Sequence, residues 1–225
     1  MTSLVYLHGF ADGPNDLKGG YCRDWAESRG IDFHGPDLNL PAFESLTISA
    51  QVDAVETLLK QLASAPVLVG SSLGGLVALA AADRRSPVKA LILLAPAFGF
   101  AQRRLESDLW AGYRLRGNLP VWHSATNSWL RLGPQLLADL PAWADENWRV
   151  EVPTFVLHGR RDEIVPVEES EAFVRRTPNA RLLILDDVHE LSAPPSMDVL
   201  GEVLMKSFEG SDSIIAAIET VGLAE

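Results

Sequence analysis

The sequence predicts an α/β fold, a doubly wound and mostly parallel sheet of about six strands with a small helical cap. The first observation is that short apolar segments alternate with longer segments of helical periodicity, as in successive right-handed βαβ units. The second is that several apolar segments are nearly continuous runs of Val, Leu and Ile, which is typical of strands covered on both faces. The third is that 47% of the 225 residues are hydrophobic, enough for a sizeable core. We therefore expect a single domain over residues 1–225.

The expected strands and helices follow one another along the chain. Strands are predicted at residues 4–7, 31–34, 66–70, 88–95, 154–157 and 181–185. Helices are predicted at residues 18–29, 48–63, 73–84, 167–176 and 196–208, and a shorter amphipathic helix at 213–221. Four of these helices fall between consecutive strands, where they would serve as the crossover connections that parallel strands require.

The connection between the fourth and fifth predicted strands is far longer than a crossover, from Pro96 to about Glu151. Connections of this length are usually functional or disordered. Five of the six tryptophans lie in it, and this aromatic content argues against disorder. We therefore interpret residues 97–150 as a helical cap over the sheet. The alternative is an additional helical layer that does not contact a ligand.

Composition and charge disfavour several classes of function. With a net charge of −11, the chain should repel nucleic acid and anionic membranes, so neither is expected as a partner. The single cysteine, Cys22, cannot form an intrachain disulfide, which suits a reducing compartment, and it lacks the neighbours of a catalytic thiol. The first apolar run has no basic segment before it, and no apolar stretch approaches the roughly 20 residues needed to cross a bilayer. A cytoplasmic location is therefore expected.

A candidate nucleophile lies in the turn at residues 70–74, which read Gly-Ser-Ser-Leu-Gly. The turn joins the predicted strand 66–70 to the predicted helix 73–84, which is the context that a G-x-S-x-G nucleophile motif requires. A tight turn of this kind raises the serine hydroxyl above the sheet. The amides at the start of the following helix favour negative charge that develops at the reacting centre.

The spacing of the glycines selects Ser72 over Ser71. Gly70 and Gly74 stand two residues before and two residues after Ser72, where they let the backbone pass close by, whereas Ser71 lacks glycines at the corresponding positions. A Ser/Gly-rich turn without chemistry is the alternative. A phosphate-binding loop is disfavoured because its lysine and its longer spacing are missing.

Four short motifs occur in the order expected of one enzyme family. They are Tyr-Leu-His-Gly-Phe at 6–10, Gly-Ser-Ser-Leu-Gly at 70–74, His-Gly-Arg-Arg-Asp-Glu-Ile-Val-Pro at 158–166 and Asp-Val-His-Glu-Leu at 187–191. On these motifs the chain resembles the α/β-hydrolases over nearly its whole length, apart from the cap and about the last fifteen residues. Because it begins directly with the His-Gly-Phe strand, it is most similar to the small YqiA-like esterases. Two departures are the absence of the family's two opening antiparallel strands and a valine, Val188, where a glycine often precedes the histidine.

The resemblance implies a catalytic triad of Ser72, Asp162 and His189, in the chain order that the fold uses. Ser72 would be the nucleophile, His189 would accept and return its proton, and Asp162 would orient the imidazole ring. The other candidates for the base or the acid are weaker. They are His8 and His158, which each precede a glycine at a strand end; His34 and His123, which lack a motif; Asp186 and Asp187, which lie too near His189 and are interpreted as solvated charges; and Glu163, which is out of register.

The resemblance also implies an oxyanion hole formed by the backbone N–H groups of Phe10 and Leu73. A sheet order of 2-1-3-4-5-6 would support this assignment. The chain direction then switches between the first and third strands, so that the loops at Phe10 and Ser72 flank one crevice.

Hydrolysis of a carboxylic ester or thioester through an acyl-enzyme intermediate, with no metal and no organic cofactor, is the reaction that the resemblance implies. The aromatic cap suggests a small, apolar substrate, and Trp110, Trp122 and Trp129 are the candidates for contact with it. Carbon–carbon bond hydrolysis and amide hydrolysis can use the same triad. A non-enzymatic ligand-binding protein of this fold is the alternative from another class, although such proteins often lack the acid or the base. The sequence contains no signal for an oligomeric state.

Overall fold

The computed structural model describes residues 2–84, 86–144 and 148–209, so the helix predicted at 213–221 lies outside the described residues. Its main sheet has six parallel strands in the order β2-β1-β3-β4-β7-β8. The strands are β1 (Leu4–Leu7), β2 (Phe33–His34), β3 (Val67–Ser71), β4 (Ala90–Leu94), β7 (Thr154–Gly159) and β8 (Ala180–Leu185). The predicted fold class and the strand order 2-1-3-4-5-6 are thereby confirmed.

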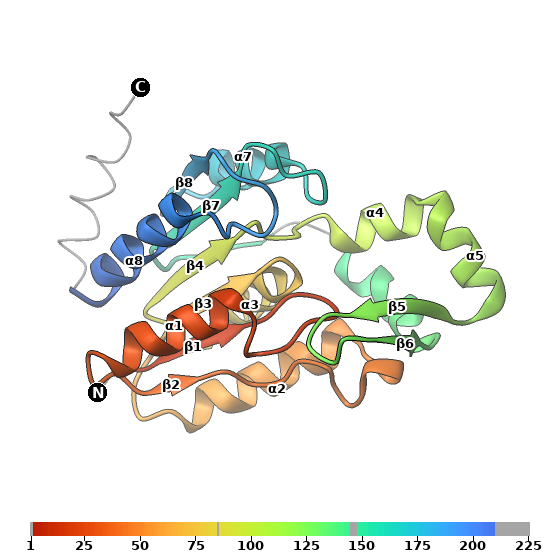
Figure 1. Ribbon diagram of the computed structural model, residues 1–225, viewed down its shortest axis with the longest axis horizontal. Helices are drawn as coiled ribbons and strands as arrows, with labels where there is room; N and C mark the ends of the chain where they lie inside the picture. The colour runs from red at the N-terminus through yellow and green to blue at the C-terminus, as the bar shows by residue number, and fades with distance from the viewer. Residues whose placement is uncertain (1, 85, 145–147, 210–225) are drawn as a thin grey trace.

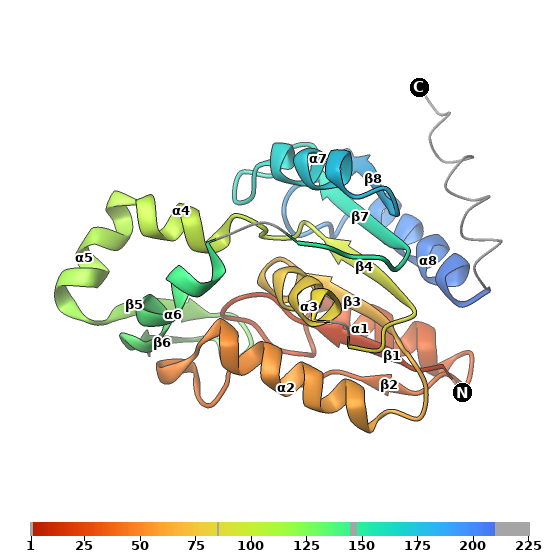
Figure 2. The same cartoon turned by 180° about the vertical axis from the view of Figure 1, so that it is seen from behind.

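Helices cover both faces of this sheet (Figures 1 and 2). One face carries α1 (Leu17–Glu27) and α8 (Pro194–Glu209), and the other carries α2 (Ile48–Gln61), α3 (Leu73–Asp83) and α7 (Val167–Arg176).

Polar side chains cap the N-termini of α1 and α2. Asp16 accepts a hydrogen bond from the Gly19 N–H at 2.7 Å, and Thr47 accepts one from the Ala50 N–H at 3.1 Å. Such caps satisfy amides that have no partner within the helix.

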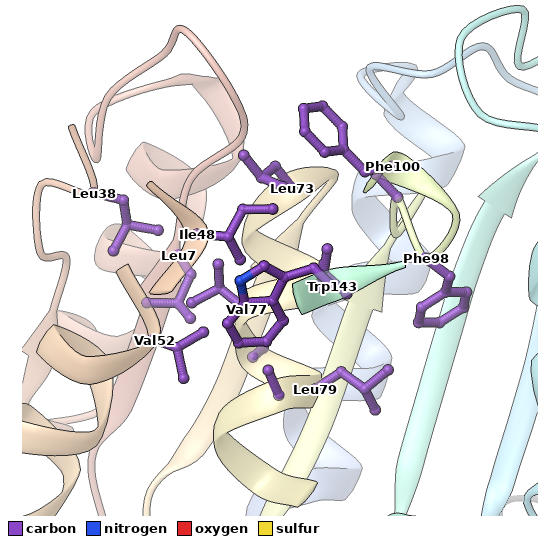
Figure 3. Close-up of a cluster of buried hydrophobic side chains, with 14 of the residues drawn as sticks. Leu7, Leu38, Ile48, Val52, Leu73, Val77, Leu79, Phe98, Phe100 and Trp143 are labelled. Atoms are coloured by element: carbon purple, nitrogen blue, oxygen red, sulfur yellow. The ribbon is translucent and has the colours of Figure 1, made fainter. Parts of the chain in front are cut away.

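The two faces of the sheet contribute to two separate hydrophobic clusters, because successive strand residues point to opposite sides. In β1, Leu4 and Tyr6 belong to the cluster beneath α1 and α8, whereas Val5 and Leu7 belong to the larger cluster beneath α2 and α3. Figure 3 shows part of the larger cluster, where Trp143 lies with side chains of α2 and α3. Burial on both faces explains the continuous apolar runs of the strands.

The segment between β4 and β7 extends beyond the carboxyl end of the sheet, where Figure 1 shows α4 and α5 to the side of the main body. It contains α4 (Phe100–Glu106), α5 (Asp108–Arg116), β5 (Leu119–His123), β6 (Ser128–Leu132), α6 (Gln135–Asp139) and the short 3-10 helix η2 (Leu140–Trp143). A second short 3-10 helix, η1 (Phe43–Ser45), contacts β6. No helix among the described residues is long and apolar enough to cross a membrane.

The segment contains the helices expected of the cap, but the cap is not helical throughout, because β5 and β6 form an antiparallel hairpin. Burial alternates along each of these strands, with period two, and each ends in a buried residue, His123 or Leu132. Trp122 and Trp129 form a cross-strand pair on the opposite side, with ring centroids 5.7 Å apart. Directly opposite residues of an antiparallel pair point to the same face, which brings these two rings together.

Candidate active site

Ser72 occupies a strained turn between β3 and α3. Its backbone has φ 52° and ψ −116°, in a region that non-glycine residues rarely adopt and that costs of the order of 1–3 kcal/mol. Two hydrogen bonds hold the turn: the Ser72 N–H donates to the Leu94 carbonyl at 2.8 Å, and the Ser72 carbonyl accepts from the Ala97 N–H at 3.0 Å. The end of β4 therefore fixes the position from which the Ser72 hydroxyl projects.

The glycines that flank Ser72 are required by close backbone contacts. A Cβ atom at Gly70 would lie 2.4 Å from the Gly74 carbonyl oxygen, and a Cβ atom at Gly74 would lie 2.3 Å from the carbonyl oxygen of Leu7. Both distances are shorter than real Cβ contacts. The turn can therefore approach the end of β1 only because neither position carries a side chain.

Ser72, His189 and Asp162 form a hydrogen-bonded relay. The Oγ atom of Ser72 lies 3.0 Å from Nε2 of His189, and Nδ1 of His189 lies 2.7 Å from Oδ2 of Asp162. An ionised carboxylate can only accept, so Nδ1 carries the ring proton and Nε2 is free to accept the proton of Ser72. The structure thus brings together the three residues that the sequence singled out, from the turn after β3, the loop after β7 and the loop after β8.

Several donors surround the Asp162 carboxylate. Oδ1 accepts from the backbone N–H groups of Ile164 and Val165, each at 2.8 Å, and Oδ2 lies near both His189 and His158. Burial alone would raise the pKa of Asp162, but these hydrogen bonds outweigh it and hold the pKa well below its usual range. The carboxylate is therefore ionised whenever the relay is assembled at neutral pH.

Ser72 lines a cavity of about 320 Å³. Its wall includes His189 and Phe10 as well as Ser72, so two members of the relay and the β1–α1 loop face one space. The volume is at the small end of ligand pockets, which span roughly 300–1,000 Å³. Within the described ranges, no group of three or more His, Cys, Asp or Glu side chains could hold a metal ion.

The family model described as "Uncharacterised protein family (UPF0227)" matches residues 3–193. The chain belongs to UPF0227. The resemblance to the small YqiA-like esterases is confirmed by this match. No curated protein matches the chain by sequence.

Solved structures similar to this UPF0227 chain have the α/β-hydrolase fold. One, from Agrobacterium vitis S4 and named as a hydrolase without a stated substrate, has a TM-score of 0.80 at 23% identity and covers 92% of this chain and 88% of its own. Mouse alpha/beta hydrolase domain-containing protein 10 has a TM-score of 0.76 at 22% identity, over 96% of this chain and 90% of that one. Est1E from Butyrivibrio proteoclasticus, solved with ferulic acid bound, has a TM-score of 0.71 at 20% identity, over 99% and 90%.

His158 is a residue whose contribution the sequence analysis missed. Its ring is fully buried in the UPF0227 chain, with Nε2 3.0 Å from the Val165 carbonyl oxygen and 3.1 Å from Oδ2 of Asp162. Both neighbours of Nε2 are acceptors, so Nε2 carries the proton, and Nδ1 accepts from the Ser170 hydroxyl at 2.7 Å. The sequence offers one indication of this contact: His158 lies at the end of β7, only four residues before Asp162 in the loop that follows.

Asp187 is the second such residue, and its interpretation as a solvated charge is wrong. It is 5% exposed, and its carboxylate accepts from the N–H groups of Val188 and Ala193 at 2.8 and 2.9 Å and from the Ser196 hydroxyl at 2.7 Å. Burial would raise the pKa of Asp187, but these hydrogen bonds lower it below its ordinary value. The carboxylate thereby ties together the two ends of the loop that carries His189.

The two residues expected to form the oxyanion hole, Phe10 and Leu73, lie near Ser72. Leu73 is the first residue of α3, and Phe10 follows Gly9, at which a Cβ atom would be 3.4 Å from the Cβ of Ser72. Among the described residues, neither the Phe10 N–H nor the Leu73 N–H donates to any acceptor. Both N–H groups are therefore without an acceptor among the described residues.

The three tryptophans expected to contact substrate do not line this cavity. Trp110 is 3% exposed and packs edge-on against Phe100 and Tyr113. Trp122 and Trp129 are 45% and 67% exposed on the outer face of the hairpin. The expectation of direct contact is corrected for all three, because the hairpin turns two of them outward and the third is buried behind α4.

Proposed function

We propose that the protein is a serine hydrolase that cleaves a carboxylic ester or thioester through an acyl-enzyme intermediate. The observation that carries this proposal is the Ser72–His189–Asp162 relay, with heavy-atom distances of 3.0 and 2.7 Å, at a strained turn that opens into a cavity. The names of similar structures support it, since they include an esterase with ferulic acid bound and a monoacylglycerol lipase. All three positions of the relay are filled, which argues against a binding protein that has lost its chemistry.

Acylation would begin when the Ser72 oxygen attacks the carbonyl carbon of the substrate and its proton passes to Nε2 of His189. The carbonyl oxygen becomes an oxyanion, which the N–H groups of Phe10 and Leu73 would stabilise, each worth about 2.7–4 kcal/mol of the barrier in comparable enzymes. The bond to the alcohol or thiol then breaks, and His189 returns the proton to that leaving group.

Deacylation repeats the same steps with water. His189 removes a proton from water, the resulting hydroxide attacks the acyl carbon, and the proton returns to Ser72 as the carboxylic acid leaves. Asp162 stays ionised throughout and stabilises the imidazolium that forms twice in each cycle. No step requires a redox partner or an electron acceptor.

The proposal is tested by steady-state hydrolysis of p-nitrophenyl acetate and of an acetyl thioester. We expect the wild type to hydrolyse both and Ser72→Ala to lose several orders of magnitude in kcat, because only the oxyanion hole and substrate binding remain. Asp162→Asn should also lose several orders of magnitude in kcat, because asparagine favours the wrong histidine tautomer. Wild-type rates in either variant would contradict the proposal. An inactive wild type that still binds esters would favour the binding-protein alternative.

A further inference from the structure

Helix α4 places two arginines on the wall of the cavity that contains Ser72. They differ in their partners. Arg103 forms an ion pair with Glu169 of α7. Arg104 has no ion pair and donates no hydrogen bond to any described residue. The cavity wall therefore carries one guanidinium group without a counter-ion.

Aromatic rings hold the Arg104 side chain in place. Its Cζ atom lies 5.2 Å from the centroid of Phe100 and 5.0 Å from that of Trp110, and Phe100 also lines the cavity. Such cation–π contacts orient a guanidinium but supply neither an acceptor nor a full negative charge. Trp110 thus acts behind the cavity wall as a support for Arg104.

The surroundings of Arg104 are unfavourable for an isolated cation. Its Nε atom is buried without an acceptor, and burial lowers the pKa of the guanidinium. A buried donor left unpaired costs free energy that the same group recovers when an acceptor arrives. An anionic ligand would therefore be stabilised at this position.

The other charged groups on the cavity wall are already engaged. Lys18 donates to the Glu190 carbonyl oxygen at 2.7 Å, Asp16 accepts from the Tyr6 hydroxyl at 2.7 and 2.8 Å, and Asp12 accepts from a backbone N–H at 2.9 Å. They come from the β1–α1 region and the His189 loop, whereas Arg104 comes from α4. One side of the wall thus combines several carboxylates with the hydrogen-bonded Lys18, whereas the positive charge without a hydrogen-bond acceptor belongs to the cap.

We propose that Arg104 binds a carboxylate group of the substrate, so that the preferred ester or thioester carries a carboxylate in addition to the bond that is cleaved. This inference rests on the proposed function, since it requires Ser72 to act on the same molecule. A carboxylate matches the planar donor fork of arginine and supplies one negative charge for one unpaired positive charge. A phosphate dianion fits less well, because Asp12, Asp16 and Glu190 on the same wall would repel its second charge.

The test compares matched pairs of esters that differ only in the charge of one group. Mono-p-nitrophenyl succinate and its methyl ester place the carboxylate in the acyl part, and p-acetoxybenzoate and its methyl ester place it in the alcohol part. Uncatalysed rates are subtracted. In the wild type, kcat/KM should be higher for the charged member of at least one pair.

Arg104→Met removes the charge and the donors while keeping a long apolar side chain over the two rings. We expect the charged-to-neutral ratio of kcat/KM to fall about ten- to a hundredfold in this variant, as for the loss of hydrogen bonds to a charged group. Arg104→Lys keeps the positive charge but not the planar pair of N–H donors, so its charged-to-neutral ratio of kcat/KM should fall less than that of Arg104→Met. Arg116→Met in α5 is the matched control, because Arg116 does not line the cavity, and its ratio should equal that of the wild type.

A wild-type ratio in Arg104→Met, with hydrolysis still dependent on Ser72, would overturn the inference and leave the proposed function intact. If Arg104→Met does not fold, an unchanged ratio in Arg104→Gln, which also removes the charge, would overturn it equally. Calorimetry on Ser72→Ala compares the same esters without turnover. It measures the dissociation constants of the two charged esters and of their methyl esters. Tighter binding of a charged member, lost on adding Arg104→Met, supports carboxylate binding at Arg104, and equal binding contradicts it. Whether Ser72 carries out the hydrolysis is decided separately by the turnover of Ser72→Ala.

Discussion

His158 and Asp162 are buried against each other, with Nε2 of His158 3.1 Å from Oδ2 of Asp162 and neither side chain exposed. The same carboxylate oxygen receives the hydrogen bond from His189. A buried histidine that forms no hydrogen bond with Ser72 therefore helps to position the Asp162 carboxylate and to lower its pKa. The loop after β7 is organised around this pair.

Replacing His158 with leucine should weaken both the relay and the fold. The substitution removes one donor to Asp162 and leaves the Ser170 hydroxyl and the Val165 carbonyl without their partner, which costs about 1–3 kcal/mol for a buried polar group. It should also raise the pKa of Asp162 and lower kcat with little change in KM, because the carboxylate is held less firmly against His189. His158→Gln, which retains an N–H donor, should recover part of both effects. A leucine variant with the wild-type kcat would show that His158 is structural only.

Asp187→Asn should lower activity through the position of His189. An amide offers one acceptor oxygen where the carboxylate accepts three hydrogen bonds, and its NH₂ group would face a donor. We expect kcat to fall at least tenfold and the free energy of unfolding to fall by about 1–3 kcal/mol. Asp186→Asn is the matched control, because the side chain of Asp186 is 85% exposed and pairs only with Arg161 at the surface. Equal effects of the two substitutions would contradict the assignment.

The pKa values of Asp162 and Asp187 predict how stability depends on pH. Both are lowered in the folded state, whereas an unfolded aspartate has a pKa of about 3.9, so the unfolded chain takes up protons first as the pH falls. The stability that these two carboxylates contribute is complete above about pH 5. It is lost as the pH falls through about 4 towards their pKa values in the folded state. Urea unfolding across this range should show the loss in the wild type. The stability gap between wild type and Asp187→Asn should narrow over the same range, and a constant gap would contradict the assignment.

Much of the sheet and the central relay could be predicted from sequence, because both depend on local patterns. Apolar runs that are buried on both faces identify strands, and the glycines around Ser72 are fixed by backbone contacts that no other residue permits. Asp162 and His189 each follow a strand within a recognisable motif. These features need no knowledge of which distant residues meet.

The cap and the supporting residues could not be predicted in the same way. The hairpin strands β5 and β6 are only five residues each, and their alternating pattern was obscured by the high aromatic content of the segment. Aspartate is a residue type that usually lies on the surface. Only the folded loop brings three hydrogen-bond donors to the buried carboxylate of Asp187. The unpaired state of Arg104 likewise depends on which acidic side chains the fold places near α4.

Gly74→Ala should disrupt the turn that carries Ser72. The new Cβ atom would lie 2.3 Å from the Leu7 carbonyl oxygen and 2.5 Å from that of His8, and backbone atoms cannot move aside cheaply. We expect a loss of at least about 1–3 kcal/mol in unfolding free energy and a large loss of activity. Gly20→Ala in α1 is the control: its Cβ atom would meet nothing within 4 Å, so it should stabilise the helix by about 0.5–1 kcal/mol. Similar stabilities for the two variants would refute the packing argument.

The account depends most on Ser72 being the nucleophile, and covalent labelling measures this directly. A fluorophosphonate probe should add one label to the wild type, and peptide mapping should place it on Ser72. Ser71→Ala, which changes the neighbouring buried serine, should still be labelled at Ser72, whereas Ser72→Ala should not be labelled. Labelling that persists in Ser72→Ala, or that maps to Ser71, would contradict the assignment.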